Sequence, residues 1–345
     1  MMTSRKFLAL SLVTLLLPLG TVHATNKSKA AVGSAGTNGT TAFDPPADVD
    51  PPSVCERDLG TGTDPLGMWF TQLIHFLCKQ GDADSLLAAY LITLPPFGTH
   101  AEADHGLLAR AYAVGKNNPK VLWVVAFDQD CRPIVECGPG YQRNLAAAQE
   151  LTRIDLDNAM AWFALAYAQS LNVVTPGKIN LALERADKAP RIHDYGFDLL
   201  KLAAAATGQI PIPDAALHID AVPPSSPESV RWTFLFTTTQ MNGRLRDWIG
   251  NCEANYLERE QALKRAKLCA AAKSQFKQGD SLLTLSEDST VSAAIPAELR
   301  LRPSGIGNLH GISDDDYAKA AIAAIAESNS EREMYAKLLA RLGRK

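Results

Sequence analysis

Apolar residues recur every three or four positions along most of the chain, in Ala-Leu-rich stretches separated by Pro, Gly and Asn. This spacing lays an apolar stripe along one side of a helix, whereas the strict alternation of a half-buried strand is rare here. Helices are therefore predicted over residues 66–79 and 103–115. The run VLWVVAF at 121–127 is rich in β-branched residues, but it follows Asn-Asn-Pro and fits the helical register of its neighbours better. The pattern predicts an all-α fold.

Three helix starts carry recognisable capping residues. Thr99 and Glu102 form a capping box ahead of residues 103–115, and Ser226 precedes a proline at a first helical turn. Ser313 precedes three aspartates, whose carboxylates suit the positive end of a helix dipole. Each motif supports a helical segment at its position.

Aromatic residues recur along these helices with a nearly constant period. Trp162 follows Trp123 by 39 residues, Phe197 follows Trp162 by 35, and Trp232 follows Phe197 by 35. We interpret the extra length of the first interval as an insertion, the cysteine-bracketed loop DCRPIVECGPG. A period in the mid-thirties is typical of helix-turn-helix solenoids, in which each unit buries its apolar stripe against the next. Repeats are expected over about 100–240, followed by C-terminal helices over 241–345.

The recurring aromatics are assigned to packing between helices rather than to a ligand groove, because they recur in phase with Leu and Ala. The predicted repeat core comprises Trp123, Trp162, Leu165, Phe197 and Trp232. Replacing Trp162 by alanine is then expected to cost about 3–5 kcal/mol of stability. A near-neutral result would place this side chain on the surface.

The segment NLAAAQELTRIDLDNAMAWFALAYA resembles a tetratricopeptide unit. Residues 154–158 match the family's turn at the end of a helix, and Trp162, Leu165 and Ala166 match its opening tryptophan, leucine and small residue. Leu156 stands where the family usually has proline, and Gln169 where it has tyrosine. The resemblance covers residues 144–170 and implies a helix-turn-helix fold. It brings no ligand-binding residues, because groove positions vary among family members. The whole chain also resembles uncharacterised exported helical-repeat proteins of Gram-negative bacteria, which implies no activity.

The N-terminus has the layout of a cleavable secretory signal. Arg5 and Lys6 precede an apolar stretch over 7–20, and small residues lead to a predicted cleavage after Ala24. An uncleaved anchor is the alternative, but the stretch is short for the roughly 20 residues that a membrane span needs. Residues 25–53 are rich in Gly, Ser, Thr and Pro and are predicted to be a disordered linker. The helical domain is expected over 54–345, without a membrane anchor in the mature chain, in the periplasm or outside the cell.

All six cysteines lie beyond the predicted cleavage site, where an oxidising environment favours disulfides. Cys131 and Cys137 bracket a short loop and are predicted to pair. A continuous helix would hold Cys252 and Cys269 about 25 Å apart, against the roughly 6 Å between Cα atoms of a disulfide, so they can pair only if the chain reverses near GNCEAN. That pairing leaves Cys55 and Cys78, which would tie the start of the domain to its first helix. A metal or redox site is the weaker alternative, since no CxxC or zinc-ligand spacing occurs.

Net charge narrows the classes of partner. The formal charge of −3 is spread along the chain and gives no reason to expect nucleic acid or an acidic membrane surface. The basic run LKRAKL at 263–268 follows LEREQ and is interpreted as a solvated helix face with Glu-to-Lys support.

The richest ionisable cluster is THAEADH, which places His100, Glu102, Asp104 and His105 within six residues. His105 would lie about 100° round the helix from Asp104, so a capped helix start is the simpler interpretation than a metal site. His193 falls at a predicted repeat turn with Asp194 and Tyr195, and three further histidines stand alone: His75, His218 and His310. The motifs of serine hydrolases, phosphate-binding loops and zinc proteases are absent from the sequence, and no catalytic residue, metal ligand or cofactor is assigned.

These observations favour an exported interaction module for a protein or peptide partner, built on disulfide-linked helical repeats and lacking a catalytic centre. The alternative is an exported hydrolase of cell-wall or protein substrates, whose acidic and histidine residues are gathered only by the fold. A ligand surface is expected in the loop 131–137, in the Pro-rich stretches VVTPGK and QIPIPDA, or at polar positions of the inner helices. A pocket joining His100, His105 or His193 to a carboxylate would favour the enzyme.

Overall fold

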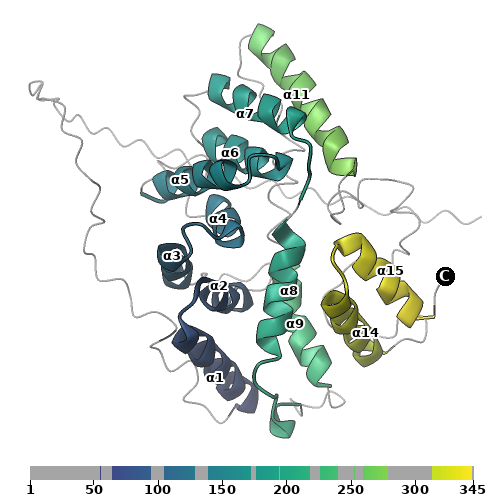
Figure 1. Ribbon diagram of the computed structural model, residues 1–345. Coiled ribbons are helices and arrows are strands. Elements are labelled where there is room, and N and C mark those ends of the chain that lie inside the picture. The colour runs from purple at the N-terminus through teal and green to yellow at the C-terminus, as the bar shows by residue number, and fades with distance from the viewer. Residues whose placement is uncertain are drawn as a thin grey trace, which may run out of the picture. The chain divides into compact units, whose positions relative to one another are not determined.

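The computed structural model describes residues 55, 64–94, 105–128, 139–171, 176–193, 195–217, 226–239, 252, 259–278 and 313–343. Every regular element in these ranges is helical, so the predicted fold class is confirmed (Figure 1). The elements are α1 (Pro65–Gln80), α2 (Ala83–Ile92), α3 (His105–Val114), α4 (Pro119–Ala126), α5 (Pro139–Ile154), α6 (Ala159–Ser170), α7 (Pro176–Lys188), α8 (Tyr195–Thr207), the 3-10 helix η1 (Asp214–Leu217), α9 (Pro227–Thr239), α11 (Arg259–Gln278), α14 (Asp314–Glu327) and α15 (Glu331–Arg341).

The chain divides into two units, Met1–Asp48 and Val49–Lys345, and all described residues belong to the second. Among the described helices, none has both the length and the apolar composition that a bilayer span requires. Several predictions concern residues outside the described ranges: the signal segment 1–24, the linker 25–53, the capping box at Thr99 and Glu102, the pair Cys131–Cys137, and His100, His218 and His310.

Helix ends follow from local chemistry. Asp64 caps α1, with its carboxylate accepting backbone hydrogen bonds of 3.1 Å from two residues in the first turn. The helix ends at Gly81, whose φ of 70° is the left-handed conformation that glycine adopts without strain. Ser226 and Ser313 accept hydrogen bonds from backbone amides three residues on, so both predicted starts are confirmed. The run 121–127 is helical as predicted.

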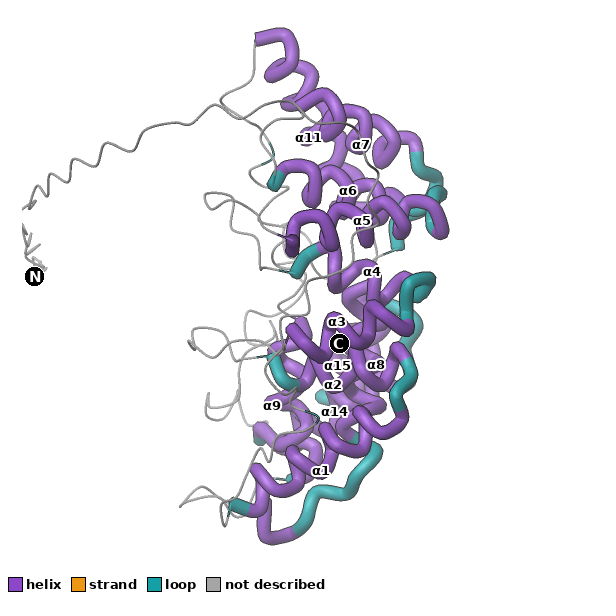
Figure 2. The backbone as a smooth tube through the Cα atoms, turned by 90° about the vertical axis from the view of Figure 1, so that its left-hand side faces the viewer, coloured by secondary structure: helices purple, strands orange, loops and turns teal. Residues whose placement is uncertain are grey.

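Helices that are consecutive in sequence pack against each other from α1 through α7, and α11 packs on the far side of α7 (Figures 1 and 2). The first helices of the two central pairs, α4 and α6, also touch. The chain then turns back, because α8 packs on α2 and α4, and α9 packs on α8 and α2. The pair α14–α15 follows on this side, where α14 contacts α8 and α9. Packing between consecutive helices therefore extends from α1 to α7, and contact between the first helices of neighbouring pairs is seen for α4 and α6.

The core is one continuous apolar cluster that draws on nearly every described helix. Trp69 is buried in it and donates an indole hydrogen bond of 3.1 Å to the carbonyl of Ile210. Trp123 is buried between the rings of Phe127 and Tyr195, with centroids 4.6 and 5.4 Å away. Aromatic side chains thus join α8 to α4, as expected for residues with large apolar surfaces.

The predicted repeat core divides into two groups. Trp123, Leu165, Phe197 and Trp232 are buried. Trp162 packs against the same core but is only partly buried. It follows its capping asparagine by four residues, whereas Trp123 follows its own by five. A shift of one residue rotates a helical side chain by about 100°, which turns Trp162 toward the edge of the core.

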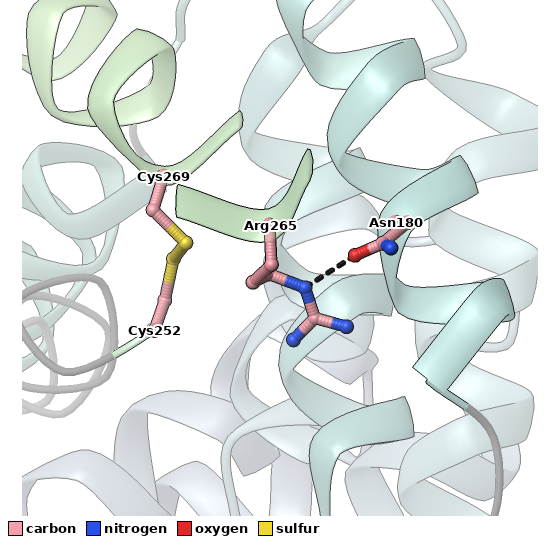
Figure 3. The surroundings of a disulfide bond; sticks show 4 residues. All are labelled: Asn180, Cys252, Arg265 and Cys269. Carbon is pink, nitrogen blue, oxygen red and sulfur yellow. Dashed lines mark hydrogen bonds between the residues drawn. A yellow bond between two sulfur atoms is a disulfide. The ribbon is translucent and has the colours of Figure 1, made fainter. Parts of the chain in front are cut away.

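Two predicted disulfides form within the described residues. Cys55 joins Cys78 of α1 with Cα atoms 5.8 Å apart, and Cys252 joins Cys269 of α11 at 6.1 Å (Figure 3). Cys252 lies ahead of α11, so the pair does not share one helix, as its geometry required. Disulfides of this kind are consistent with an oxidising, exported compartment.

Candidate functional site

The most interconnected polar group in the described chain lies where the turn between α5 and α6 meets the turn between α7 and α8. This turn cluster consists of Asp155, Asn158, Arg191 and Tyr195. The backbone amide of Ala159 donates to the carbonyl of Arg191 at 2.8 Å, and the amide of Arg191 donates to the carbonyl of Asp157 at 3.1 Å. Two turns more than thirty residues apart in sequence are thereby joined as an isolated β-bridge.

Asn158 is fully buried and is the centre of the turn cluster. Its Oδ1 accepts hydrogen bonds from the amides of Met160, at 3.1 Å, and His193, at 2.9 Å. Its Nδ2 donates to Asp155 at 2.9 Å and to the carbonyl of His193 at 3.0 Å. The Asn158 side chain therefore caps α6 and also binds the segment ahead of α8. Because its buried amide is hydrogen-bonded through both Oδ1 and Nδ2, its burial does not leave polar atoms without partners.

Asp155 completes the cluster through its carboxylate. The Tyr195 hydroxyl and the Arg191 guanidinium both donate hydrogen bonds to it. Burial raises the pKa of the Tyr195 phenol above its ordinary value, and the hydrogen bond to Asp155 raises it further. Tyr195 consequently keeps its proton at physiological pH and acts as a hydrogen-bond donor to the carboxylate.

The fixed turn displays two apolar side chains, Leu156 and Trp162, which we term the turn patch. Leu156 is 61% exposed, and its carbonyl accepts a 2.8 Å hydrogen bond from the indole Nε1 of Trp162. Arg191 contacts the chain on both sides of Leu156, through Asp155 and through the carbonyl of Asp157. The patch is thus an apolar pair with a charged residue beside it, on a turn that backbone and side-chain hydrogen bonds hold.

His193 lies beside this cluster, between α7 and α8 as predicted. Its Nε2 is 2.9 Å from a carboxylate oxygen of Asp198 in the first turn of α8, and its ring lies edge-on to Tyr195 with centroids 5.1 Å apart. Both side chains of the ion pair are well exposed. Asp198 in this first turn complements the positive end of the helix dipole.

A second polar group centres on Asp128, which is almost fully buried at the end of α4. Arg143 Nη2 donates to its carboxylate at 2.6 Å, and His105 Nδ1 lies 3.2 Å from it. Asn144 Nδ2 donates to the backbone carbonyl of Asp128 at 2.9 Å. The group joins α3, α4 and α5, and a buried carboxylate is tolerated because it is paired and hydrogen-bonded.

The residues of the two clusters were only partly predicted from the sequence. His105 does meet a carboxylate, but that partner is Asp128, which the histidine-rich segment itself did not suggest. Glu102 and Asp104 lie outside the described residues. Among the described residues, no group of three His, Cys, Asp or Glu side chains is arranged to hold a metal ion. Sequence reasoning missed Arg191 and Asp155, although the departure from proline at Leu156 marked this turn as unusual.

No protein-family model matches the chain, and comparisons with curated proteins and with solved structures give no significant match. The turn cluster and the turn patch are therefore interpreted from their own geometry.

Proposed function

We propose that the protein is an exported, non-enzymatic interaction module that binds a protein or peptide partner through tetratricopeptide-like helical repeats. The observation that carries this proposal is the turn patch, where Leu156 is 61% exposed and Trp162 is partly buried on a turn that hydrogen bonds hold in place. Tryptophan and arginine, both present at this turn, are among the residues that dominate the energetics of protein interfaces.

The rigidity of the turn supports the same function. A partner that docks on a preformed surface loses less conformational entropy than one that must first order a loop. Asn158 and Tyr195 provide that order through their side-chain hydrogen bonds, together with two backbone hydrogen bonds of 2.8 and 3.1 Å between the turns. The pairs α4–α5 and α6–α7 support the tetratricopeptide-like arrangement, because consecutive helices pack and the first helices touch.

The rival function, an exported hydrolase, would use the His105–Asp128 pair. In that pair Asp128 also binds Arg143 and receives Asn144 at its carbonyl, contacts that serve to join three helices. The described contacts favour the interaction module over this rival.

A pull-down from the native envelope fraction tests the proposal. The exported chain is compared with Leu156→Lys and with Val114→Lys, a control on α3 at a residue that is 60% exposed. We expect a partner that the wild type and the control capture equally and that Leu156→Lys captures at least about tenfold less, the loss of a single interface hot spot. Equal capture by all three chains, or no specific capture by the wild type, would contradict a binding role for the turn patch.

A further inference from the structure

A second exposed face, on α7 and α11, gathers basic side chains around two leucines. On α7 it consists of Lys178, Leu181, Arg185 and Lys188, all exposed. Their spacing of three, four and three residues places them along one side of the helix. On α11 it consists of Leu263, Lys264 and Lys267, also exposed. We term these seven residues the cationic face.

The two stripes adjoin at one ion pair. Lys264 of α11 binds the carboxylate of Glu184 on α7. The pKa of Glu184 is lowered first by that hydrogen bond and also by the positive charge of Lys188. Lys188 and Lys264 therefore lie on the same side of the helix pair, within electrostatic reach of one carboxylate. The cationic face thus runs from one helix to the next.

Buried contacts hold α11 on α7 beneath this face. The guanidinium of Arg265 hydrogen-bonds to Asn180, and both side chains are buried (Figure 3). Gln275 Nε2 donates to the carbonyls of Ala186 and Asp187 at 3.2 and 3.0 Å. The disulfide to Cys252 fixes α11 from its other side. The relative positions of the two stripes are therefore set by the fold, and no rearrangement is needed to assemble them.

The chemistry of the face is that of a peripheral membrane contact. Five cations outnumber the carboxylates of Glu184 and of Glu260, the exposed acid at the start of α11. Leu181 and Leu263 are 55% and 59% exposed among these cations. Long basic side chains keep their charged ends at the headgroups while their stems and neighbouring apolar residues enter the interface.

We propose that the cationic face binds an anionic phospholipid surface, with Leu181 and Leu263 entering the headgroup region. The five cations match the negative charge of such a surface, and the exposed leucines match the apolar boundary beneath its headgroups. The net charge of the whole chain, −3, predicted no such partner. The local concentration of positive charge favours an anionic lipid surface as partner. This proposal does not depend on the turn patch.

Sedimentation with lipid vesicles tests this proposal. The exported chain is mixed with vesicles of equimolar phosphatidylglycerol and phosphatidylcholine, and with vesicles of phosphatidylcholine alone. The variant Arg185→Glu/Lys188→Glu is compared with Lys79→Glu/Lys116→Glu, which changes the net charge equally at two other exposed residues. All chains share the same N-terminal segment, so any contribution from it appears equally in each.

We expect the wild-type chain to bind the vesicles that contain phosphatidylglycerol and not the vesicles of phosphatidylcholine alone. Each basic residue near an anionic leaflet contributes about a fivefold factor in binding, so the α7 variant should bind at least about twenty-five-fold more weakly and the control unchanged. Raising the salt to about 1 M, where the Debye length is about 3 Å, should release the wild type. Equal weakening in both variants, or salt-insensitive binding, would overturn the proposal. So would binding to soluble polyglutamate without binding to vesicles, which would assign the face to an acidic polypeptide.

Discussion

Two similar segments, KNNPKVLW at 116–123 and LDNAMAW at 156–162, lead into α4 and α6, and we term them the α4 phrase and the α6 phrase. They lie in different surroundings. Asn118 caps α4 by accepting a 3.0 Å hydrogen bond from the amide of Lys120, and Asn158 caps α6 in the same way at 3.1 Å from Met160. Each asparagine also reaches a different part of the chain. Asn118 donates to Asp84 of α2 at 2.7 Å, and Asn158 donates to the turn ahead of α8.

The difference lies in register. Trp123 is the fifth residue after its capping asparagine, Asn118. Trp162 is the fourth residue after Asn158. The fifth residue after Asn158 is Phe163, which is buried like Trp123. Matching the phrases by their tryptophans therefore misplaces α6 by one residue, or about 100° of rotation. Aligned by their caps, Phe163 takes the core position, and Trp162 is free to lie at the edge beside Leu156.

The largest difference in unfolding free energy between the α4 phrase and the α6 phrase is expected when their aromatic residues are replaced. Trp123→Ala removes a fully packed ring and should cost about 3–5 kcal/mol of unfolding free energy, and Phe163→Ala a similar amount. Trp162→Ala should cost only about 1–2 kcal/mol, since its ring is only partly buried. Urea denaturation followed by circular dichroism measures all three. A loss at Trp162 as large as at Trp123 would refute the register argument.

The second effect concerns the caps. Asn158→Ala leaves buried donors and acceptors of the turn cluster without partners, and should cost about 2–4 kcal/mol. Asn118→Ala loses the cap and the bond to Asp84, but that position is less buried, so about 1 kcal/mol is expected. Urea midpoints measured on the two variants side by side give the comparison. Equal losses would mean that the turn cluster adds nothing beyond ordinary capping.

Local features of the fold were predictable and long-range ones were not. The caps at Ser226 and Ser313 and the helical class depend on neighbouring residues, so the sequence contained them. The return of α8 onto α2 and α4 depends on contacts such as Trp123 with Tyr195, which are set by packing. The candidate site was only partly predictable from the sequence. Arg191 and Asp155 belong to no recognisable motif, and they are more than thirty residues apart in the chain.

A smaller effect should distinguish the turns by their response to pH. The hydroxyl of the buried Tyr195 hydrogen-bonds to the turn ahead of α6, and Tyr195→Phe should cost about 1–2 kcal/mol at neutral pH through its lost bond to Asp155. The folded-state pKa of Tyr195 is raised above its ordinary value of 10. Its contribution to stability is therefore complete below about pH 10, the unfolded pKa, and declines as the pH rises further, because the unfolded chain loses the proton first.

Denaturation midpoints of the wild type and Tyr195→Phe between neutral pH and pH 11 measure this difference, with pH 11 as roughly one unit above the unfolded pKa. The gap between the two proteins should narrow above about pH 10. A constant gap would mean that the Tyr195 hydroxyl titrates normally and is not held by Asp155.

The smallest effect on stability is expected at Leu156. Two residues before the cap, the α4 phrase has Lys116, an exposed lysine, where the α6 phrase has Leu156, an exposed leucine. The chain thus already uses a charged residue at the matching position, and Leu156→Lys should change the unfolding free energy by less than about 0.5 kcal/mol. A small change would be consistent with the proposed binding role of this leucine. A loss of more than about 1 kcal/mol in the same urea titration would instead assign Leu156 to the packing of the turn, and would remove the reason for treating it as part of a binding surface.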